Sequence, residues 1–134
     1  MEALINFSVP LYLVRGKRKP KNYWLNLNSY RNWKYHLNND LKIQFKKAIH
    51  CSLANLDPIK GPIRIIYIFY YPTHQRRDIG NSLAVISKFT EDALVEEGII
   101  PDDDYTIIKS ISGKYGGYDK ENPRCEVIIK ESDE

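Results

Sequence analysis

Hydrophobic and polar residues along the 134-residue chain follow patterns that predict several β-strands. The clearest run is residues 63–71, almost all β-branched or aromatic, which predicts a central strand covered on both faces. Residues 5–14 predict a strand bent at Pro10, because proline has no N–H to donate within a sheet. Residues 105–112 and 124–130 favour two final strands, separated by a long hairpin loop or irregular extension over residues 113–123.

Apolar residues at steps of three and four predict two amphipathic helices. The first begins near Asn28 or Ser29, either of which can cap it, and ends before Asp57. Its expected buried stripe is Tyr30, Trp33, Leu37, Leu41, Phe45, Ala48 and Ile49. The second covers residues 79–97 and stops at Gly98. The resulting order, β-α-β-α-β-β, predicts an α/β fold: a single domain over residues 1–134, with a small mixed β-sheet and two packed helices.

Composition places the chain among ordinary globular proteins. Hydrophobic residues make up 43% and charged residues 28% of the sequence. No apolar run approaches the ~20 residues that a membrane-spanning helix needs, and we do not expect residues 1–5 to be a secretory signal. We therefore expect a cytoplasmic protein without a membrane partner. The two cysteines, Cys51 and Cys125, have no nearby zinc ligands and are expected to be reduced and at least partly buried.

Charge is distributed unevenly between the two halves of the chain. Residues 1–77 hold 14 Lys or Arg and 3 Asp or Glu, a formal charge of +11, whereas residues 78–134 carry −8. A basic half suggests a polyanionic partner such as DNA. The densest cluster lies in the predicted loop 15–21, whose candidate DNA-binding residues are Lys17, Arg18, Lys19 and Lys21. The alternative is that the opposite charges simply mix on the folded surface.

Acidic residues flank the second predicted helix. Asp78 stands before it, directly after Arg76 and Arg77, and the run Asp102–Asp104 follows it. Mg²⁺ prefers oxygen ligands of this kind, and arginines near a metal suit a phosphate-bearing substrate. Two structural explanations compete with a metal site: an aspartate at a helix start caps it, and three aspartates after a proline form an ordinary polar turn.

The order of these residues resembles the RusA family of Holliday junction resolvases, also called crossover junction endodeoxyribonucleases. The resemblance covers about residues 71–109: Arg-Asp-x-x-Asn, a helix with a lysine and the ending Asp92-Ala93-Leu94, a glycine turn, and an acidic pair before a strand. It implies a Mg²⁺-dependent endonuclease that acts as a homodimer on branched DNA such as four-way junctions. By position it implies catalytic roles for Asp78, Lys88 and Asp103.

The resemblance also indicates the remaining site residues. Asp78 and Asp103 would bind the metal, with Asp102, Asp104, Asp92 or Asn81 as the substitute ligand. Arg76, Arg77 and Asn81 would contact DNA, together with the basic loop. A small nuclease of this type would suit a phage.

Two departures from the family pattern keep other functions open. Gly80 stands where the family has its second aspartate, and the helix is longer by about one turn, ~3.6 residues. A DNA-binding protein that has lost catalysis is therefore the second hypothesis. A structural or interaction domain whose charges serve only the surface is the third.

Overall fold

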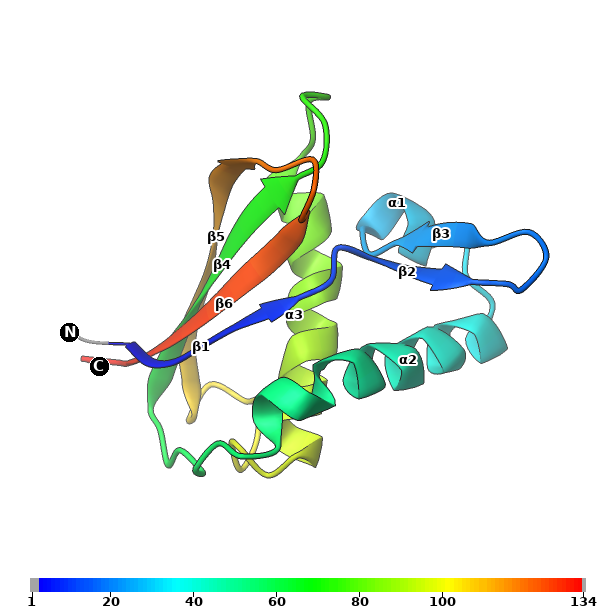
Figure 1. The fold of residues 1–134 in the computed structure, drawn as a ribbon. Helices are drawn as coiled ribbons and strands as arrows, with labels where there is room; N and C mark the ends of the chain where they lie inside the picture. Colours follow the sequence, from blue (N-terminus) through cyan, green and yellow to red (C-terminus); the bar gives the residue numbers. More distant parts are fainter. Residues whose placement is uncertain (1–2, 134) are drawn as a thin grey trace.

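The computed structural model describes residues 3–133 and forms a mixed α/β structure (Figure 1). Three helices and six strands occur within that range. Their bounds are β1 (Ala3–Val9), β2 (Tyr12–Arg15), β3 (Lys21–Trp24), α1 (Leu27–Tyr30), α2 (Tyr35–Leu53), β4 (Ile63–Tyr71), α3 (Ile79–Glu96), β5 (Ile108–Tyr118) and β6 (Arg124–Glu131). The predicted α/β class and the mixed sheet are confirmed.

Four strands form the main sheet in the order β1-β6-β4-β5. β6 pairs antiparallel with both β1 and β4, whereas β4 and β5 are parallel. A parallel pair needs a crossover connection, and α3 provides it. The chain therefore leaves β4 at one end of the sheet, returns along α3, and enters β5 at the other end (Figure 1).

The core lies between one face of this sheet and the helices. Alternate residues of β4, from Ile63 to Tyr71, are buried on that face. α2 contributes Leu41, Phe45, Ile49 and Leu53, at helical steps of four, which bury one stripe of the helix. Phe45 meets Phe89 of α3 edge to face, with ring centroids 5.6 Å apart. The other face of β4 is only half-buried, so the expectation of cover on both faces was wrong.

The predicted strand 5–14 is divided at Pro10, and its second part leaves the main sheet. β2 pairs with β3 in a separate antiparallel hairpin, which carries the basic loop at its turn. The backbone N–H of Leu25 donates to the Leu11 carbonyl at 3.0 Å and closes the base of this hairpin. The pattern missed β3 because its four residues, Lys21–Trp24, are too few to show an alternation.

The first predicted helix is two helices, α1 and α2, so three helices are present in the described range instead of two. α1 is capped by Asn26, whose Oδ1 accepts from the Ser29 N–H at 2.9 Å, not by Asn28 or Ser29. The turn between the helices lets Tyr30 and Trp33 both lie near Phe89. The centroid of each ring is 6.5 Å from the centroid of the Phe89 ring. Ala48 was placed on the buried stripe but is exposed.

β5 is longer than predicted and forms one edge of the sheet. It begins at Ile108, after a turn over residues 101–107, and continues through the expected loop as far as Tyr118. Gly116 allows this strand to approach β4 closely, since a Cβ at that position would lie 2.6 Å from both Ile68 and Tyr70 side-chain atoms. Ile111, Tyr115 and Tyr118 remain substantially exposed on this strand.

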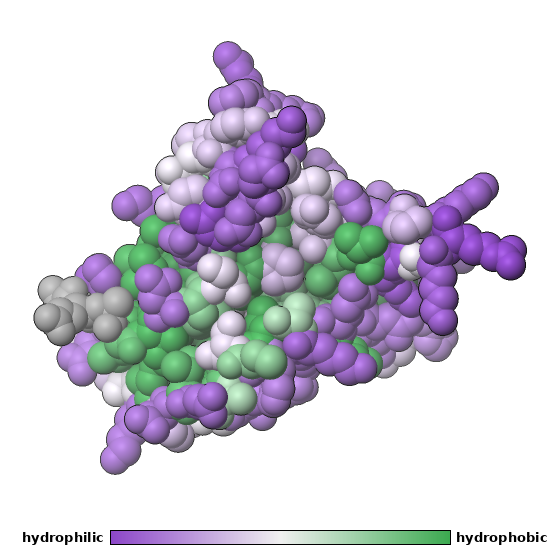
Figure 2. All heavy atoms as spheres, in the orientation of Figure 1, coloured by the Kyte–Doolittle hydropathy of each residue, from purple (hydrophilic) through white to green (hydrophobic). Residues whose placement is uncertain are grey.

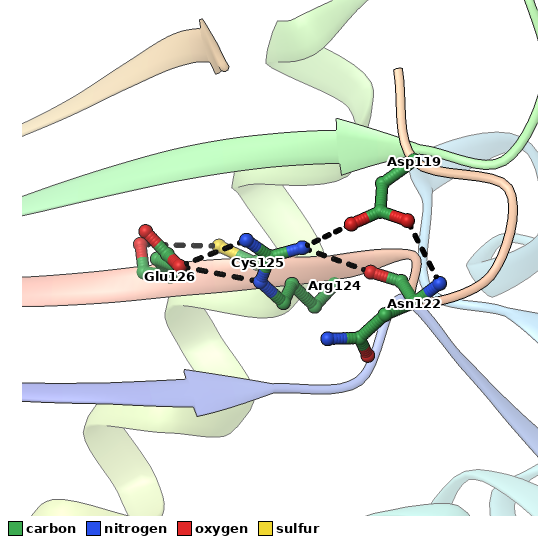
Figure 3. A network of polar contacts seen from close by, with 5 residues as sticks. All are labelled: Asp119, Asn122, Arg124, Cys125 and Glu126. Carbon is green, nitrogen blue, oxygen red and sulfur yellow. Dashed lines mark hydrogen bonds and ion pairs between the residues drawn. The ribbon is translucent and has the colours of Figure 1, made fainter. Parts of the chain in front are cut away.

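Arg124 fixes the connection between β5 and β6 (Figure 3). Its guanidinium donates to Asp119 Oδ2 at 2.9 Å, to the Asn122 carbonyl at 3.0 Å and to Glu126 Oε1 at 3.0 Å. It also lies 4.1 Å from the centroid of the Tyr70 ring. These contacts hold the end of β5 rigidly beside the end of β4.

Two further expectations concern cysteines and membranes. Cys125 is buried as expected, but Cys51 is exposed on α2, and neither forms a disulfide. Among the helices of residues 3–133, none combines the length and the apolar character that crossing a membrane requires.

Candidate nucleic-acid interface

Asp78 is the N-cap of α3. Its Oδ1 accepts the Gly80 N–H at 2.9 Å, and its backbone carbonyl accepts the Asn81 N–H at 3.1 Å. Aspartate is favoured here because it satisfies N–H groups that a helix start leaves unpaired. The carboxylate is nevertheless exposed. Gly80 lies in the first turn and supplies only its backbone, so the second aspartate of the family pattern has no side-chain substitute at this point.

The acidic turn, Asp102–Asp104, lies beyond the other end of α3. Asp102 Oδ1 accepts the Asp103 N–H at 2.7 Å, and Asp104 Oδ1 accepts both the N–H and the hydroxyl of Thr106. These hydrogen bonds lower the pKa of Asp104. All three side chains are exposed. Their hydrogen bonds are those of a turn that leads the chain into β5.

The fold separates Asp78 from the acidic turn, which corrects the predicted metal site. Asp78 follows the end of β4, and the turn precedes the start of β5, which is parallel to β4 (Figure 1). α3 spans 18 residues, so the two sites are on the order of 25 Å apart at 1.5 Å per residue. Oxygens that share one Mg²⁺ each lie about 2.1 Å from it. One chain therefore cannot bind a single ion through both groups.

Nor does the structure complete a metal site around either group alone. In residues 3–133 no three His, Cys, Asp or Glu side chains are arranged to bind a metal. Lys88, the expected electrostatic helper, is exposed and lies ten residues into α3, about 15 Å along the axis from Asp78. Because α3 is longer than the helix of the family pattern, Lys88 lies farther from Asp78 than that pattern predicts.

Arg77 lies against two aromatic rings at the Asp78 end of α3. Its guanidinium carbon lies 5.4 Å from the centroid of the Trp24 ring and 4.9 Å from that of Tyr71, so two aromatic faces hold it. The Nη1 atom is buried, and no hydrogen-bond partner for it occurs in the described part of the chain. A buried charged donor without a partner is costly, which makes an anionic ligand its natural complement.

A polar cleft lies beside Arg77. It has a volume of about 230 Å³, and its lining includes Asp78, Arg76, Arg77 and Asn81. Asn26, the N-cap of α1, and Asn28, within α1, also line it. The structure thus brings together Arg76, Arg77 and Asn81, three of the predicted DNA-binding residues, and adds two asparagines that sequence reasoning missed.

The remaining predicted DNA-binding residues lie around the turn of the hairpin. Hydrophilic side chains extend from this turn at the right of the molecule (Figures 1 and 2). Lys17, Arg18, Lys19 and Lys21 are all exposed there. The hairpin base joins Trp24, which contacts Arg77, so one element links the basic turn to the arginine pair.

Some basic residues of the first half of the chain pair with acidic residues of the second half. Lys42, Lys46 and His50 of α2 lie 3.9, 2.5 and 2.6 Å from Asp92, Glu96 and Glu97. The basic face of α2 therefore pairs with the acidic second half of the chain, as the alternative explanation proposed. Within residues 3–133, the cations without an ion pair include Arg76, Arg77 and those of the hairpin turn.

Glu91 is a feature that the sequence analysis did not identify. It lies half-buried on α3, and its Oε2 accepts the Tyr67 hydroxyl at 2.7 Å. Burial raises the pKa of Glu91 from 4.5 to about 7; the charges of Asp103 and Asp92 also raise it, while the Tyr67 hydrogen bond opposes the shift. Its position three residues before Leu94, an apolar residue of the same helix, was the sequence signal that could have indicated burial.

Comparison with known proteins adds no assignment. No family model matches the sequence, and no curated protein is significantly similar to it. The likeness to RusA resolvases therefore depends on the motif between residues 71 and 109 alone.

Proposed function

We propose that the protein binds branched DNA through the Arg77 end of α3 and cuts it, as a homodimer, with a divalent metal. The observation that carries the proposal is the Arg77 guanidinium: held between Trp24 and Tyr71, with a buried Nη1 that has no partner within residues 3–133. A phosphate in the adjoining cleft, which Arg77 and Arg76 both line, would offset the charge of this guanidinium and contact the accessible part of both arginines.

The surroundings favour a nucleic acid over a small anion. Side-chain amides of Asn26, Asn28 and Asn81 line the same cleft, and the basic hairpin extends the positive surface outward from it. DNA carries a phosphate along each strand at regular intervals, so a long basic surface gains more from it than from a single anion. Asp78 is exposed within this cleft, close to where a phosphate would bind.

Cutting requires a second protein copy, because one chain cannot bring its acids together. A homodimer would have to bring Asp78 of one protomer near Asp103 of the partner subunit, and two-fold symmetry would form this site twice. A four-way junction has matching two-fold symmetry and needs two symmetric cuts. These carboxylates would hold Mg²⁺, whose preferred ligands are oxygens.

The binding part is tested with Arg77→Ala, because this change removes the guanidinium without disturbing a predicted metal ligand. We expect affinity for a labelled four-way junction to fall about tenfold or more, as for the loss of a charged hydrogen bond. The slope of log affinity against log salt should also decrease by about one. Lys60→Ala is the control, an exposed lysine in the connection before β4. Equal affinity of wild type and Arg77→Ala would contradict the proposed role.

The cutting part is tested by mixing two inactive variants. Asp78→Asn and Asp103→Asn should each abolish Mg²⁺-dependent cleavage. When the two are unfolded and refolded together, half of the mixed dimers' sites contain both wild-type aspartates, and nicking of the junction should return. A site within one chain would give no activity in the mixture.

A non-cutting DNA-binding protein is the second candidate. Two observations favour it: Gly80 replaces an acid, and the acids of one chain lie at opposite ends of α3. Salt-sensitive junction binding with no cleavage in Mg²⁺ or Mn²⁺, and a monomer at micromolar concentration, would select this alternative.

A further inference from the structure

An aromatic cleft lies beside the arginine pair, on the side of the edge strand β5. It has a volume of about 370 Å³, and its lining includes Tyr71, His74, Arg76, Arg77, Ile79 and Tyr115. Volumes of this size suit a small ligand and are too small for a duplex. The cleft therefore offers aromatic and apolar surface on one side and two guanidinium groups on the other.

The rings around this cleft are arranged in stacked pairs. Tyr71 and Tyr115 are nearly parallel, with an interplanar angle of 15° and centroids 6.4 Å apart. His74 stacks on Tyr118 at 4.0 Å. Tyr115 is 58% exposed and Tyr118 43%, although large aromatic side chains are usually covered. Stacked rings with open faces are the surface on which nucleobases bind.

The ends of the strands hold this platform in place. Tyr118 ends β5, and the next residue, Asp119, donates its backbone N–H to the Tyr71 carbonyl at 2.8 Å. Asp119 also accepts from Arg124, in the network of Figure 3. The Tyr71 hydroxyl donates to Ser82 Oγ of α3 at 3.0 Å, which fixes the position of the Tyr71 ring. A pre-ordered platform loses little conformational entropy when a base stacks on it.

We propose that this cleft binds one unpaired nucleotide of the DNA, with its base on Tyr115 and its phosphate at Arg76 and Arg77. The inference rests on the proposed DNA binding and specifies which part of the DNA is recognised. Base faces are hidden inside a duplex and become available at a branch point or in a single strand. The neighbouring arginines place positive charge where the backbone of that nucleotide would lie.

The test uses the full chain and oligonucleotides that contain the fluorescent base 2-aminopurine. The probe is placed either unpaired at the centre of a three-way junction or paired in a duplex of the same sequence. Wild-type protein should change the fluorescence of the unpaired probe and leave the paired probe almost unchanged. Anisotropy of an end-labelled copy of each DNA gives the affinity independently.

Two matched variants locate the effect. Tyr115→Leu should weaken binding to the unpaired DNA by about fivefold to a hundredfold, the range found for losing one base–aromatic stack, and should abolish the fluorescence change. Tyr115→Phe should keep both. Tyr105→Leu is the control, because Tyr105 is 80% exposed and lies at the opposite end of α3, near the acidic turn.

The possible outcomes separate this inference from the proposed function. If Tyr115→Leu and wild type bind the three-way junction that contains the unpaired base with the same affinity, the platform is wrong and the proposed DNA binding is unaffected. An unchanged 2-aminopurine signal in wild-type protein that binds the junction would overturn it as well, without any variant. No binding of any DNA at low salt would overturn the proposed function, and the platform with it.

Discussion

Replacing Glu91 with glutamine should stabilise the protein at alkaline pH. The carboxyl of Glu91 lies half-buried against the Tyr67 hydroxyl, and burial raises its pKa from 4.5 to about 7. The folded state thus holds a proton that the unfolded state has already released between pH 4.5 and 7. Stability from this group is fully present below pH 4.5 and is lost as pH rises through 7.

The size of the effect follows from the two pKa values. At about 1.4 kcal/mol for each pH unit, the interval from 4.5 to about 7 corresponds to roughly 3 kcal/mol. Because solvent reaches part of this side chain, we expect about 2 kcal/mol above pH 8. Glutamine imitates the protonated carboxyl in shape and can still accept from Tyr67, so the Glu91→Gln variant escapes this loss.

Urea unfolding followed by circular dichroism at pH 4.5 and pH 8.5 measures the prediction. The variant should be more stable than wild type by about 2 kcal/mol at pH 8.5 and nearly equal at pH 4.5. Glu121→Gln, in the exposed connection between β5 and β6, should match wild type at both values. A variant that is less stable than wild type at pH 8.5, or equally shifted at both pH values, would refute the reasoning.

Three further predictions concern packing and backbone. Phe45→Ala should destabilise the protein by ~3–5 kcal/mol in urea unfolding, because Phe45 is fully buried against Phe89. Ile43→Ala, on the exposed side of α2, should cost less than ~1 kcal/mol. Similar losses in both variants would contradict the core assignment. Gly116→Ala should cost ~1–3 kcal/mol or separate β5 from β4, since the added methyl group meets Ile68 and Tyr70, and hydrogen exchange of the β5 amides would report it. Gly98→Ala should cost about 1 kcal/mol, measured as a lower urea midpoint: the new Cβ meets no atom within 4 Å, but φ is +74°. An unchanged midpoint would mean that this residue relaxes out of the left-handed conformation.

Long periodic segments were predicted well because each carries its own signal. β4 has the predicted bounds, and α3 ends one residue before the predicted position. Both carry strong local patterns: β4 is a nine-residue run that is apolar or aromatic except for Arg64, and α3 is an 18-residue helix closely followed by glycine. The short hairpin β2–β3 and the four-residue α1 were missed for the opposite reason. Such elements are stabilised by contacts such as Arg77 on Trp24, which no local pattern contains.

The sequence by itself determined which residues form α3 and that acids stand at both of its ends. Only the tertiary structure decided that these acids are far apart, because strand direction is a property of the assembled sheet. β5 pairs parallel with β4, so α3 must carry the chain back along the length of the strands. Asp78 and Asp103 therefore lie at opposite ends of the strands. The same pairing brings Tyr115 and Tyr118 next to Tyr71 and His74, more than forty residues earlier in the chain.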